Sequence, residues 1–450
     1  MSKDRIVIVG GDAAGMSAAS KIRREQPERD ILVLERTAFT SYSACGMPYF
    51  LGGMFDDFKK LVARSPETFR EKYNIDVRTH HEVIAIDPDK QCVTIRIGAN
   101  KEIQEPYDQL LIATGARPSC PKVPNADAEG VFGLSTLASG LRVHEFMSTM
   151  KPKSAVVVGG GYIGLEMAEA LIRQGLGVSL VQRSPEVMGT LDPDMGKLIS
   201  QALRDIGVTL YLEEQLEAFE EKDGSVTAVV TSRRTLPTDL VILGMGVKPN
   251  SELASNAGIS LGAKGAIKVD SRMRTTNENI WAAGDCVATV HRITSQPIYI
   301  ALGTVANKQG VVAGTNLSGG DARFPGVVGT AVSKICDIEV ARTGLQEKEL
   351  RNLEINYATA TIKAKTRAGY FPGAGPITVK MIAEKLSGRL LGAQIVGVEG
   401  AAKRIDIVAT ALTAGMTVMD LIDLDLSYAP PFSPVWDPVQ TAARQLVKKI

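Results

Sequence analysis

Two stretches of the chain share one order of apolar, small and polar positions. Each has a run of β-branched apolar residues, a glycine cluster and then a helix-patterned segment with small residues on its packing face. The two stretches are RIVIVGGDAAGMSAASKIRR (5–24) and SAVVVGGGYIGLEMAEALIRQG (154–175). A strand, turn and helix in this pattern are typical of the opening of a dinucleotide-binding fold. The sequence therefore predicts an α/β protein with two Rossmann-like folds.

The glycine spacing is complete in the second stretch only. Gly159, Gly161 and Gly164 form G-x-G-x-x-G. The first glycine allows the tight turn, the second allows close approach to a pyrophosphate, and the third packs the helix against the strand. In the first stretch Gly10 and Gly15 fit, but Asp12 stands where the second glycine is expected. A purely structural turn is the alternative interpretation of such a match taken alone.

In each fold, the residue at the end of the next strand indicates which kind of nucleotide the fold could bind. ILVLE ends at Glu35, whose carboxylate is placed to bind the hydroxyls of a ribose. VSLVQRS instead ends in Gln182 and Arg183. Because arginine can pair with a 2′-phosphate, this end favours NADPH over NADH. A solvated arginine is the alternative, and Gln182 could also bind an unphosphorylated ribose.

Three further segments predict strands that end in glycine turns. LLIATGARPSCP (110–121) and LVILGMGVKPN (240–250) each predict a strand, a turn and a crossover. IWAAGDCVA (280–288) predicts a strand that ends at Gly284 and Asp285. A carboxylate at this strand end could bind the hydroxyls of a flavin ribityl chain.

Composition excludes several classes of protein. The 450 residues include 51 basic and 50 acidic side chains, so no polybasic field indicates nucleic acid or an anionic membrane surface. The apolar run in MSKDRIVIVGGD is too short for a secretory signal, and no run of about 18 apolar residues predicts a membrane span. The five widely spaced cysteines favour a reducing cytoplasm over a disulfide framework; they are Cys45, Cys92, Cys120, Cys286 and Cys336.

One cysteine has a distinctive setting. In SYSACGMPYF (41–50), Cys45 lies between small residues, and Phe50 stands where a dithiol enzyme would carry its second cysteine. A lone cysteine can support two-electron chemistry if the second sulfur belongs to the substrate. A helix beginning near Pro48, together with the flavin, would lower the thiol pKa through the N-terminal dipole of the helix. The alternative, a small buried hydrophobe, is assigned to the other four cysteines.

Taken together, these motifs resemble the FAD-dependent pyridine nucleotide-disulfide oxidoreductases over essentially the whole chain. SYSACGMPYFLGG, RAGYFPGAGP (367–376) and LSYAPPFSPVWDP (426–438) are similar to the single-cysteine branch, the coenzyme A (CoA) disulfide reductases and CoA-dependent NAD(P)H sulfur or polysulfide reductases. The resemblance implies a cytoplasmic homodimer. It also implies an FAD-binding domain (1–115 and 251–324), an NAD(P)H-binding domain (116–250) and an α+β dimerisation domain (325–450).

The resemblance further implies which residues form the sites. FAD would be held by Gly10, Gly11, Ala13, Ala14, Gly15, Glu35, Val83, Thr114, Gly115, Gly284, Asp285, Leu302 and Ala306. NADPH or NADH would be held by Gly159, Gly161, Tyr162, Ile163, Gly164, Glu166, Gln182, Arg183 and Gly246. CoA would contact Lys21, Arg24 and Ser41. Solvated helix charges are the alternative for the two basic residues.

In the implied reaction, Cys45 cycles between a thiolate and a mixed disulfide with CoA. The last histidine is His291, so no C-terminal histidine can serve as acid and base. The resemblance implies that Tyr370 and Tyr428 of the partner subunit donate the proton instead. Interface tyrosines with satisfied hydroxyls are the alternative.

Some positions depart from the pattern of the branch. Ala44 replaces an asparagine, and Tyr73 and Trp436 stand where some members carry phosphate-binding lysines. We therefore expect polysulfide or CoA persulfide to be preferred over CoA disulfide. The chain ends at Ile450, without the appended rhodanese domain that some members have.

Two other functions remain open. An NAD(P)H oxidase or peroxidase would use a Cys45 sulfenate, although Ala13 stands where the peroxidase carries a histidine. The pair Pro48 and Tyr49 after the cysteine also fits the CoA branch better. A flavin redox sensor, or an electron donor to a protein partner, would bind CoA only as a structural ligand.

Overall fold

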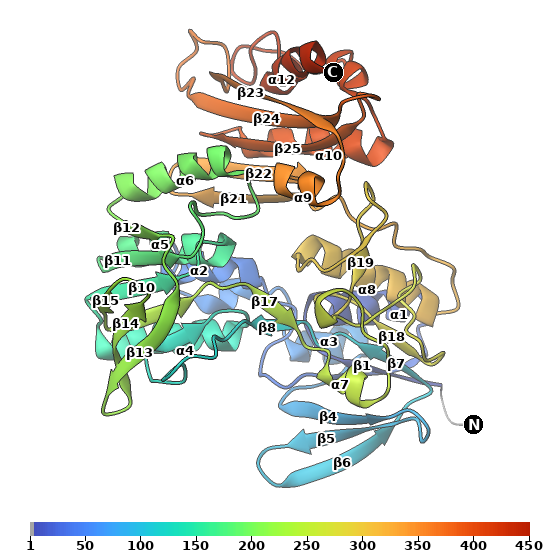
Figure 1. Ribbon diagram of the computed structural model, residues 1–450. Coiled ribbons are helices and arrows are strands. Elements are labelled where there is room, and N and C mark those ends of the chain that lie inside the picture. Colours follow the sequence, from blue (N-terminus) through green and yellow to red (C-terminus); the bar gives the residue numbers. More distant parts are fainter. Residues whose placement is uncertain (1–3) are drawn as a thin grey trace.

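The computed structural model describes residues 4–450 and contains two similar parallel sheets (Figure 1). The strands of the first sheet, in the order β18-β7-β1-β2-β3, are Ile280–Ala282, Gln109–Ile112, Arg5–Val9, Asp30–Leu34 and Asp76–Arg78. Their apolar side chains are buried, as expected for a parallel sheet with both faces covered. β18 joins this sheet although the whole second sheet precedes it in the sequence.

The second sheet has the same arrangement as the first when its strands are taken in the opposite direction. Its strands, in the order β12-β11-β10-β16-β9, are Thr209–Leu212, Gly177–Gln182, Ser154–Val158, Leu240–Leu243 and Val131–Gly133. β10, β11, β12 and β16 are in the places of β1, β2, β3 and β7. β10 is followed by helix α5 (Tyr162–Arg173), just as β1 is followed by α1 (Ala13–Glu25). The predicted pair of nucleotide-binding folds is therefore confirmed at the level of strand order.

Small residues let helices pack closely over the first sheet. Helix α8 (Gly303–Leu317) runs against α1, and a β-carbon added at Gly310 would lie 2.3 Å from the carbonyl oxygen of Ala14. The other helices of residues 4–256 with eight or more residues are α3 (Pro66–Tyr73), α4 (Leu137–Met150) and α6 (Pro193–Asp205), and the short helix α7 (Glu252–Asn256) follows them.

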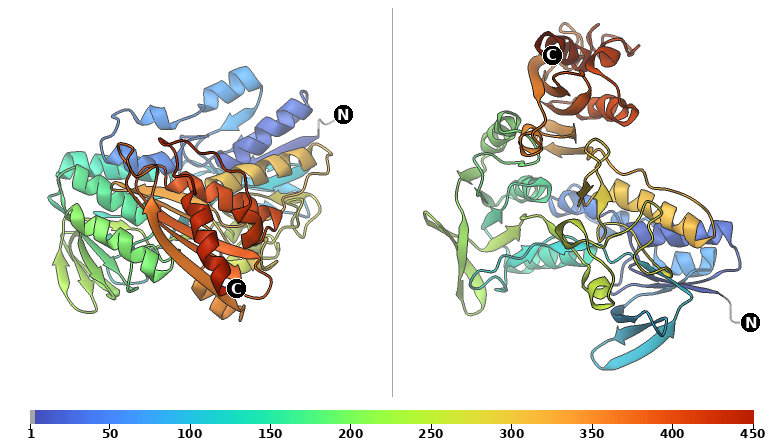
Figure 2. Two further views of the ribbon diagram at one scale, coloured as in Figure 1. Left: turned by 90° about the horizontal axis from the view of Figure 1, so that it is seen from above. Right: turned by 45° about the vertical axis from the view of Figure 1, so that its right-hand side comes forward.

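Each parallel sheet is accompanied by a small antiparallel sheet. The first comprises β4 (His81–Asp87), β5 (Cys92–Ile97) and β6 (Lys101–Pro106). The second comprises β13 (Leu216–Lys222), β14 (Ser225–Thr231) and β15 (Thr235–Pro237). The sheet β4–β6 lies at the opposite end of the molecule from the C-terminus in Figure 1 and in the right-hand view of Figure 2.

The two crossovers between the nucleotide-binding folds are paired with each other. β8 (Ala116–Pro118) and β17 (Val247–Pro249) form an antiparallel pair, and the backbone N–H of Asn250 donates to the carbonyl of Gly115 at 2.9 Å. Thr114 Oγ1 also donates to the Asn250 carbonyl at 2.6 Å. The similarity of the two crossover sequences therefore corresponds to two strands that lie side by side.

A larger antiparallel sheet forms the C-terminal part above both folds in Figure 1. In the order β21-β22-β25-β24-β23, its strands are Ala331–Ile335, Ile338–Gly344, Leu390–Gly397, Pro376–Glu384 and Tyr357–Lys365. Apolar residues on one face share a core with α10 (Ile405–Ala414), α11 (Val418–Ile422) and α12 (Pro438–Leu446). The short elements α2 (Met47–Leu51), β19 (Thr289–Val290), β20 (Pro297–Ile298) and α9 (Glu347–Asn352) complete the chain described here, apart from short 3-10 turns. Within residues 4–450, no helix combines the length and apolar character needed to cross a bilayer.

A buried cluster of charges joins the C-terminal sheet to the start of α6. Lys380 Nζ lies 2.8 Å from Asp194, 3.1 Å from Asp192 and 2.5 Å from Glu347. Gln394 accepts from the backbone of Asp192 at 2.8 Å and donates to its carboxylate at 2.7 Å. Burial alone would lower the pKa of Lys380, but its hydrogen bonds and the nearby carboxylates raise it. The ammonium group therefore stays charged and ties the second nucleotide-binding fold to the C-terminal sheet.

We expect Lys380→Met to destabilise this junction by about 3 kcal/mol, because it leaves the buried carboxylate of Asp192, and the more exposed ones of Asp194 and Glu347, without their cation. The measurement is the thermal unfolding midpoint, which should fall. Lys363→Met is the matched control, since Lys363 is exposed on the neighbouring strand and makes no ion pair within residues 4–450. Equal midpoints for the two variants would show that the cluster contributes no net stability.

Candidate functional site

Cys45 lies in one 3-10 turn (Ala44–Gly46) that leads directly into helix α2 (Met47–Leu51). The residue is exposed in the single chain. Helix α2 packs on α5, where a β-carbon added at Gly52 would lie 3.2 Å from the α-carbon of Ala170. This contact places the cysteine, which belongs to the first nucleotide-binding fold, beside the opening helix of the second.

The surroundings of Cys45 disfavour its thiolate in the single chain. Although the residue is exposed, protein atoms surround its sulfur closely enough for desolvation to be the largest cause of a raised pKa. The negative charges of Glu166, Asp285 and Asp12 raise the pKa further. α2 does begin at Met47, but it has only five residues, and burial is the largest cause of the raised pKa in the chain alone. A lowering of this pKa by the helix together with the flavin stays a prediction.

Two carboxylates of α5 connect this region to the C-terminal sheet. Ser333 Oγ donates to Glu166 at 2.6 Å, and the backbone N–H of Cys336 donates to Glu169 at 2.8 Å. Both acceptors lie on one face of the helix, since residues three apart are neighbours there. Burial raises the pKa of Glu166, with a smaller contribution from Glu169. A shallow hollow beside α2 is lined by Pro48, Tyr49, Gly52, Met54, Glu166, Glu169, Ala170 and Arg173.

The first glycine-rich turn has the shape needed for a dinucleotide. Gly10 has φ of +111°, and a β-carbon added at Gly15 would lie 1.9 Å from the Gly10 carbonyl oxygen. Glu35 accepts from the backbone N–H of Gly11 at 2.9 Å and from that of Thr37 at 2.7 Å. Asp12 is the N-cap of α1, but its side chain caps none of the helix N–H groups. These free donors at a helix N-terminus suit a pyrophosphate, so the residues fit FAD.

Asp285 is the second feature that fits FAD. Its carboxylate accepts no hydrogen bond within the part of the chain that the structure describes, and burial raises its pKa to about 6. A partly buried carboxylate without a partner suits the hydroxyls of a bound ligand. Gly284 lies against α1, where an added β-carbon would be 2.8 Å from the β-carbon of Ala14.

The second glycine-rich turn has the same geometry. Gly159 has φ of +104°, and a β-carbon added at Gly164 would lie 2.0 Å from the Gly159 carbonyl oxygen. Gln182 accepts from the backbone N–H of Gly160 at 3.0 Å, as Glu35 does at the equivalent position of the first fold. Arg183 is exposed and makes no ion pair among residues 4–450, so its guanidinium is available to a ligand.

The other predicted nucleotide contacts lie around these turns. Ala13 opens α1, and Tyr162 and Ile163 open α5. Thr114 and Gly115 follow β7, and Gly246 lies between β16 and β17. The remaining three are farther along the chain; they are Val83 in β4, Leu302 at the N-cap of α8 and Ala306 inside α8.

The predicted CoA contacts differ in how free their side chains are to bind a ligand. Lys21 already pairs with Glu25 of the same helix at 2.5 Å, whereas Arg24 is exposed. Ser41 has φ of +47° and lies at the start of the loop that leads to Cys45. The geometry therefore leaves Arg24 as the freer of the two basic side chains.

The two predicted tyrosines come together on the C-terminal part. The N–H of Ala368 donates to the carbonyl of Pro430 at 3.2 Å, which joins their loops. Arg404 also bridges these loops, through the carbonyls of Thr366 at 2.6 Å and Phe432 at 2.8 Å. The side chains of both tyrosines project from the single chain, with 78% of Tyr370 and 48% of Tyr428 exposed.

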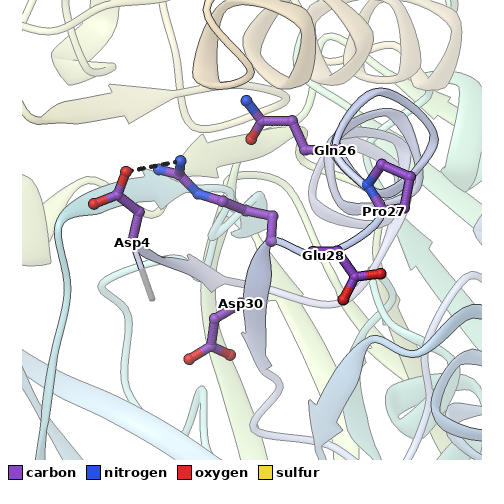
Figure 3. A pocket seen from close by; sticks show the side chains of 6 residues that line it. Asp4, Gln26, Pro27, Glu28 and Asp30 are labelled. Carbon is purple, nitrogen blue, oxygen red and sulfur yellow. Dashed lines mark hydrogen bonds and ion pairs between the residues drawn. The ribbon is translucent and has the colours of Figure 1, made fainter. Parts of the chain in front are cut away.

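Figure 3 shows another surface hollow. Its lining residues are Asp4, Gln26, Pro27, Glu28, Arg29 and Asp30. They lie beside the starts of β1 and β2, whereas the glycine turn and Glu35 follow the ends of these strands. Ligands of parallel α/β sheets bind at the carboxyl ends of the strands. We therefore assign this hollow no part in the site.

Comparison with known proteins identifies the family. The family described as "Pyridine nucleotide-disulphide oxidoreductase" matches residues 4–310, and its "dimerisation domain" matches residues 330–438. The chain belongs to the pyridine nucleotide-disulphide oxidoreductase family, which confirms the resemblance stated from the sequence.

Three similar proteins cover nearly the whole chain. The "NAD(P)H sulfur oxidoreductase (CoA-dependent)" of Pyrococcus abyssi is 41% identical, over 99% of this chain and 98% of that protein. The "NADH oxidase" of Methanocaldococcus jannaschii is 37% identical, over 99% of each. The solved structure of an NAD-dependent persulfide reductase from A. fulgidus is 41% identical and has a TM-score of 0.96, over 99% of this chain and 83% of that chain.

Two contacts of the site were not predicted from the sequence. Glu166 was predicted to contact NADPH or NADH, but its hydrogen bond to Ser333 was not predicted. Asp12 was noted only as a departure from the glycine pattern, yet Asp12 Oδ1 accepts from the backbone N–H of Tyr42 at 3.1 Å. An acid in place of a glycine was the available signal in the second case. No signal in the sequence indicated the first.

We expect Glu166→Gln to lower the pKa of Cys45, because a nearby negative charge disfavours the thiolate. At pH 8 a larger fraction of Cys45 would then be ionised, and alkylation by iodoacetamide would be faster. The measurement is the rate of Cys45 alkylation as a function of pH. Glu169→Gln is the control, since Glu169 lies one turn away and contacts Cys336. Identical pH profiles for both variants would contradict this account of the raised pKa.

Proposed function

We propose that this protein is an FAD-dependent NAD(P)H oxidoreductase that reduces CoA disulfide, CoA persulfide or polysulfide through Cys45. The observation that carries the proposal is the position of Cys45. It is an exposed thiol that directly precedes α2, which packs on α5, and the charges of Glu166 in α5 and Asp12 at the N-cap of α1 both act on it. Phe50 occupies the position of a second redox cysteine and is buried. The second sulfur therefore has to come from the substrate.

The proposed chemistry balances around one protein sulfur. The Cys45 thiolate attacks CoA disulfide, so that a mixed disulfide forms and one CoA thiolate leaves and takes a proton. Two electrons that originate from NAD(P)H then cleave the mixed disulfide, releasing the second CoA and restoring the Cys45 thiolate. Overall, NAD(P)H, a proton and CoA disulfide give NAD(P)⁺ and two CoA thiols. With CoA persulfide, Cys45 attacks the sulfur bonded to CoA, so the same mixed disulfide forms and the outer sulfur leaves as hydrosulfide. Polysulfide would enter as CoA persulfide, which forms when a CoA thiolate attacks polysulfide and a polysulfide shorter by one sulfur leaves.

The chain would hold FAD at the first turn through Gly10, Gly11, Gly15 and Glu35, with Asp285 at the end of the last strand. When bound, FAD supplies the electron transfer between nicotinamide and sulfur. NAD(P)H would bind at the second turn, where Gly159, Gly161 and Gly164 leave the helix N-terminus open. The matching geometry of the two turns supports this assignment.

Replacing Cys45 with serine tests the function directly. We expect anaerobic NADPH consumption with CoA disulfide, or with polysulfide plus CoA, to be lost in Cys45→Ser, because serine cannot form the mixed disulfide. Cys120→Ser is the matched control, since Cys120 is the other exposed cysteine in the part of the chain described here. Sustained anaerobic turnover by Cys45→Ser would refute the proposal.

An NAD(P)H oxidase is the second candidate, because the M. jannaschii relative carries that name. In this case Cys45 would cycle through a sulfenate while oxygen is reduced. Repeating the assay in air separates the two functions. NADPH loss that requires air and no sulfur substrate would favour the oxidase, whereas one reduction without turnover would indicate a redox sensor.

We also propose that Arg183 confers a preference for NADPH, with Gln182 beside it at the ribose. The exposure of Arg183 and its lack of an ion pair within residues 4–450 support this role. Arg183→Ala should lower kcat/KM for NADPH about tenfold, as expected for loss of one charge-assisted hydrogen bond, while kcat/KM for NADH changes little. Steady-state kinetics with both nucleotides measure this ratio. An unchanged ratio would show that Arg183 does not contact the 2′-phosphate.

The assembly belongs to the same proposal. We assign FAD to residues 1–115 and 251–324, NAD(P)H to 116–250 and dimerisation to 325–450. Tyr370 and Tyr428 would reach the partner's Cys45 as proton donors, and Lys21, Arg24 and Ser41 would contact CoA. The exposed aromatic side chains of the C-terminal part support a homodimer. The five free cysteines favour a cytoplasmic location.

A further inference from the structure

The two nucleotide-binding folds hold the loop after their second strand in the same way. In the first fold, the N–H of Ser41 donates to the carbonyl of Gly11 at 3.0 Å. In the second fold, the N–H of Met188 donates to the carbonyl of Gly160 at 2.7 Å. Ser41 and Met188 also share a left-handed backbone, with φ of +47° and +52°. The second fold is therefore an internal reference for the loop that carries Cys45.

Against this reference, the first fold has one additional contact. Asp12 stands at the position that Gly161 occupies in the second fold. Asp12 Oδ1 accepts from the N–H of Tyr42 at 3.1 Å, and Gly161 has no side chain to make the equivalent bond. An aspartate at an N-cap ordinarily accepts from the N–H groups of its own helix. Here the side chain caps no N–H of α1 and instead holds the Cys45 loop.

We propose that Asp12 is a positioning residue that fixes the orientation of the Cys45 loop relative to the first glycine-rich turn. The significance of this role for catalysis rests on the function proposed above. The backbone bond at Ser41 is one attachment of the loop to the glycine-rich turn, and the bond from Tyr42 to Asp12 adds a second attachment at the adjacent residue. Cys45 follows Tyr42 by three residues, so its sulfur shares that direction.

The other side of the loop is held by a different segment. The N–H of Ser43 donates to the carbonyl of Leu61, and the N–H of Ala63 donates to the carbonyl of Ser41, both at 2.8 Å. These bonds join the loop to residues 61–63, which are not part of the glycine-rich turn. Asp12 is thus the side chain through which the turn itself acts on the loop.

The role requires a hydrogen-bond acceptor and not a negative charge. Burial raises the pKa of Asp12 to about 7, the Tyr42 bond opposes this shift, and the charges of Glu35 and Asp285 add to it. Both the ionised and the protonated carboxyl can accept from Tyr42. Asparagine keeps an acceptor oxygen at the same place and removes only the titration.

The test compares Asp12→Gly with Asp12→Asn in the FAD-loaded protein. Glycine reproduces the residue of the second fold and removes the acceptor, whereas asparagine retains it. The first measurement is amide hydrogen exchange of the peptide that spans residues 40–47. We expect exchange at Tyr42 to be about tenfold faster in Asp12→Gly than in Asp12→Asn, as the loss of one such hydrogen bond predicts. Equal exchange in both variants and in the unmodified protein would overturn the proposal.

The second measurement separates positioning from cofactor binding. We expect both variants to keep FAD in a one-to-one ratio and to be reduced by NADPH at similar rates. Reoxidation by CoA disulfide or polysulfide should be slower in Asp12→Gly alone, because this step needs Cys45 in place. A similar loss in Asp12→Asn would show that the charge and not the anchor matters, which would also overturn the proposal.

The proposal can still be tested if one variant fails to fold or if the unmodified protein shows no turnover. If Asp12→Gly fails to fold or to bind FAD, Asp12→Ala carries the same comparison, since it keeps the β-carbon but removes the acceptor. If the unmodified protein reduces neither CoA disulfide nor polysulfide, the proposed function fails. The exchange measurement still decides the role of Asp12 in that case, because it does not depend on turnover.

Discussion

The close approach of a helix to a strand at each glycine-rich turn is the constraint on which the rest of the structure depends. A β-carbon at Gly15 or Gly164 would lie about 2 Å from a carbonyl oxygen of the preceding turn, far inside van der Waals contact. Only glycine therefore allows the helix to begin directly above the end of the strand. This geometry points free N–H groups towards the carboxyl edge of each sheet, where an anionic ligand is stabilised.

This constraint also positions the chemistry that neither fold could perform alone. Because α1 and α5 begin at the two turns, the segment after β2 can cross from the first fold and pack helix α2 on α5. Cys45 immediately precedes α2. Glu166 and Glu169 of α5 in turn bind the first strand of the C-terminal sheet, and Lys380 binds that sheet to α6. The thiol is thus held at a junction of three structural units whose relative positions are fixed by polar contacts.

The features that the sequence predicted are those that depend on residues close together in the sequence. The strands, the glycine turns and the equivalence of Glu35 with Gln182 follow from local patterns, and the structure shows the same hydrogen bond at both strand ends. The bonds between Glu166 and Ser333 and between Lys380 and Asp194 join residues that are 167 and 186 positions apart. A pattern of hydrophobic and polar residues does not specify such partners, because each of these charged or hydroxyl side chains, taken alone, has the pattern expected of an exposed surface residue.

The direction of the Cys45 pKa shift shows why this long-range information matters for function. The local sequence offers a short helix, whose dipole would favour a thiolate. The fold adds burial of the sulfur, which is the largest cause of the raised pKa, and then the charges of Glu166, Asp285 and Asp12, which also oppose the thiolate. The acid in the turn therefore has two opposing effects, since its hydrogen bond orders the loop while its charge disfavours ionisation. A protonated Asp12 retains the first effect and loses the second, so a buried carboxyl with a raised pKa suits this position better than an exposed carboxylate would.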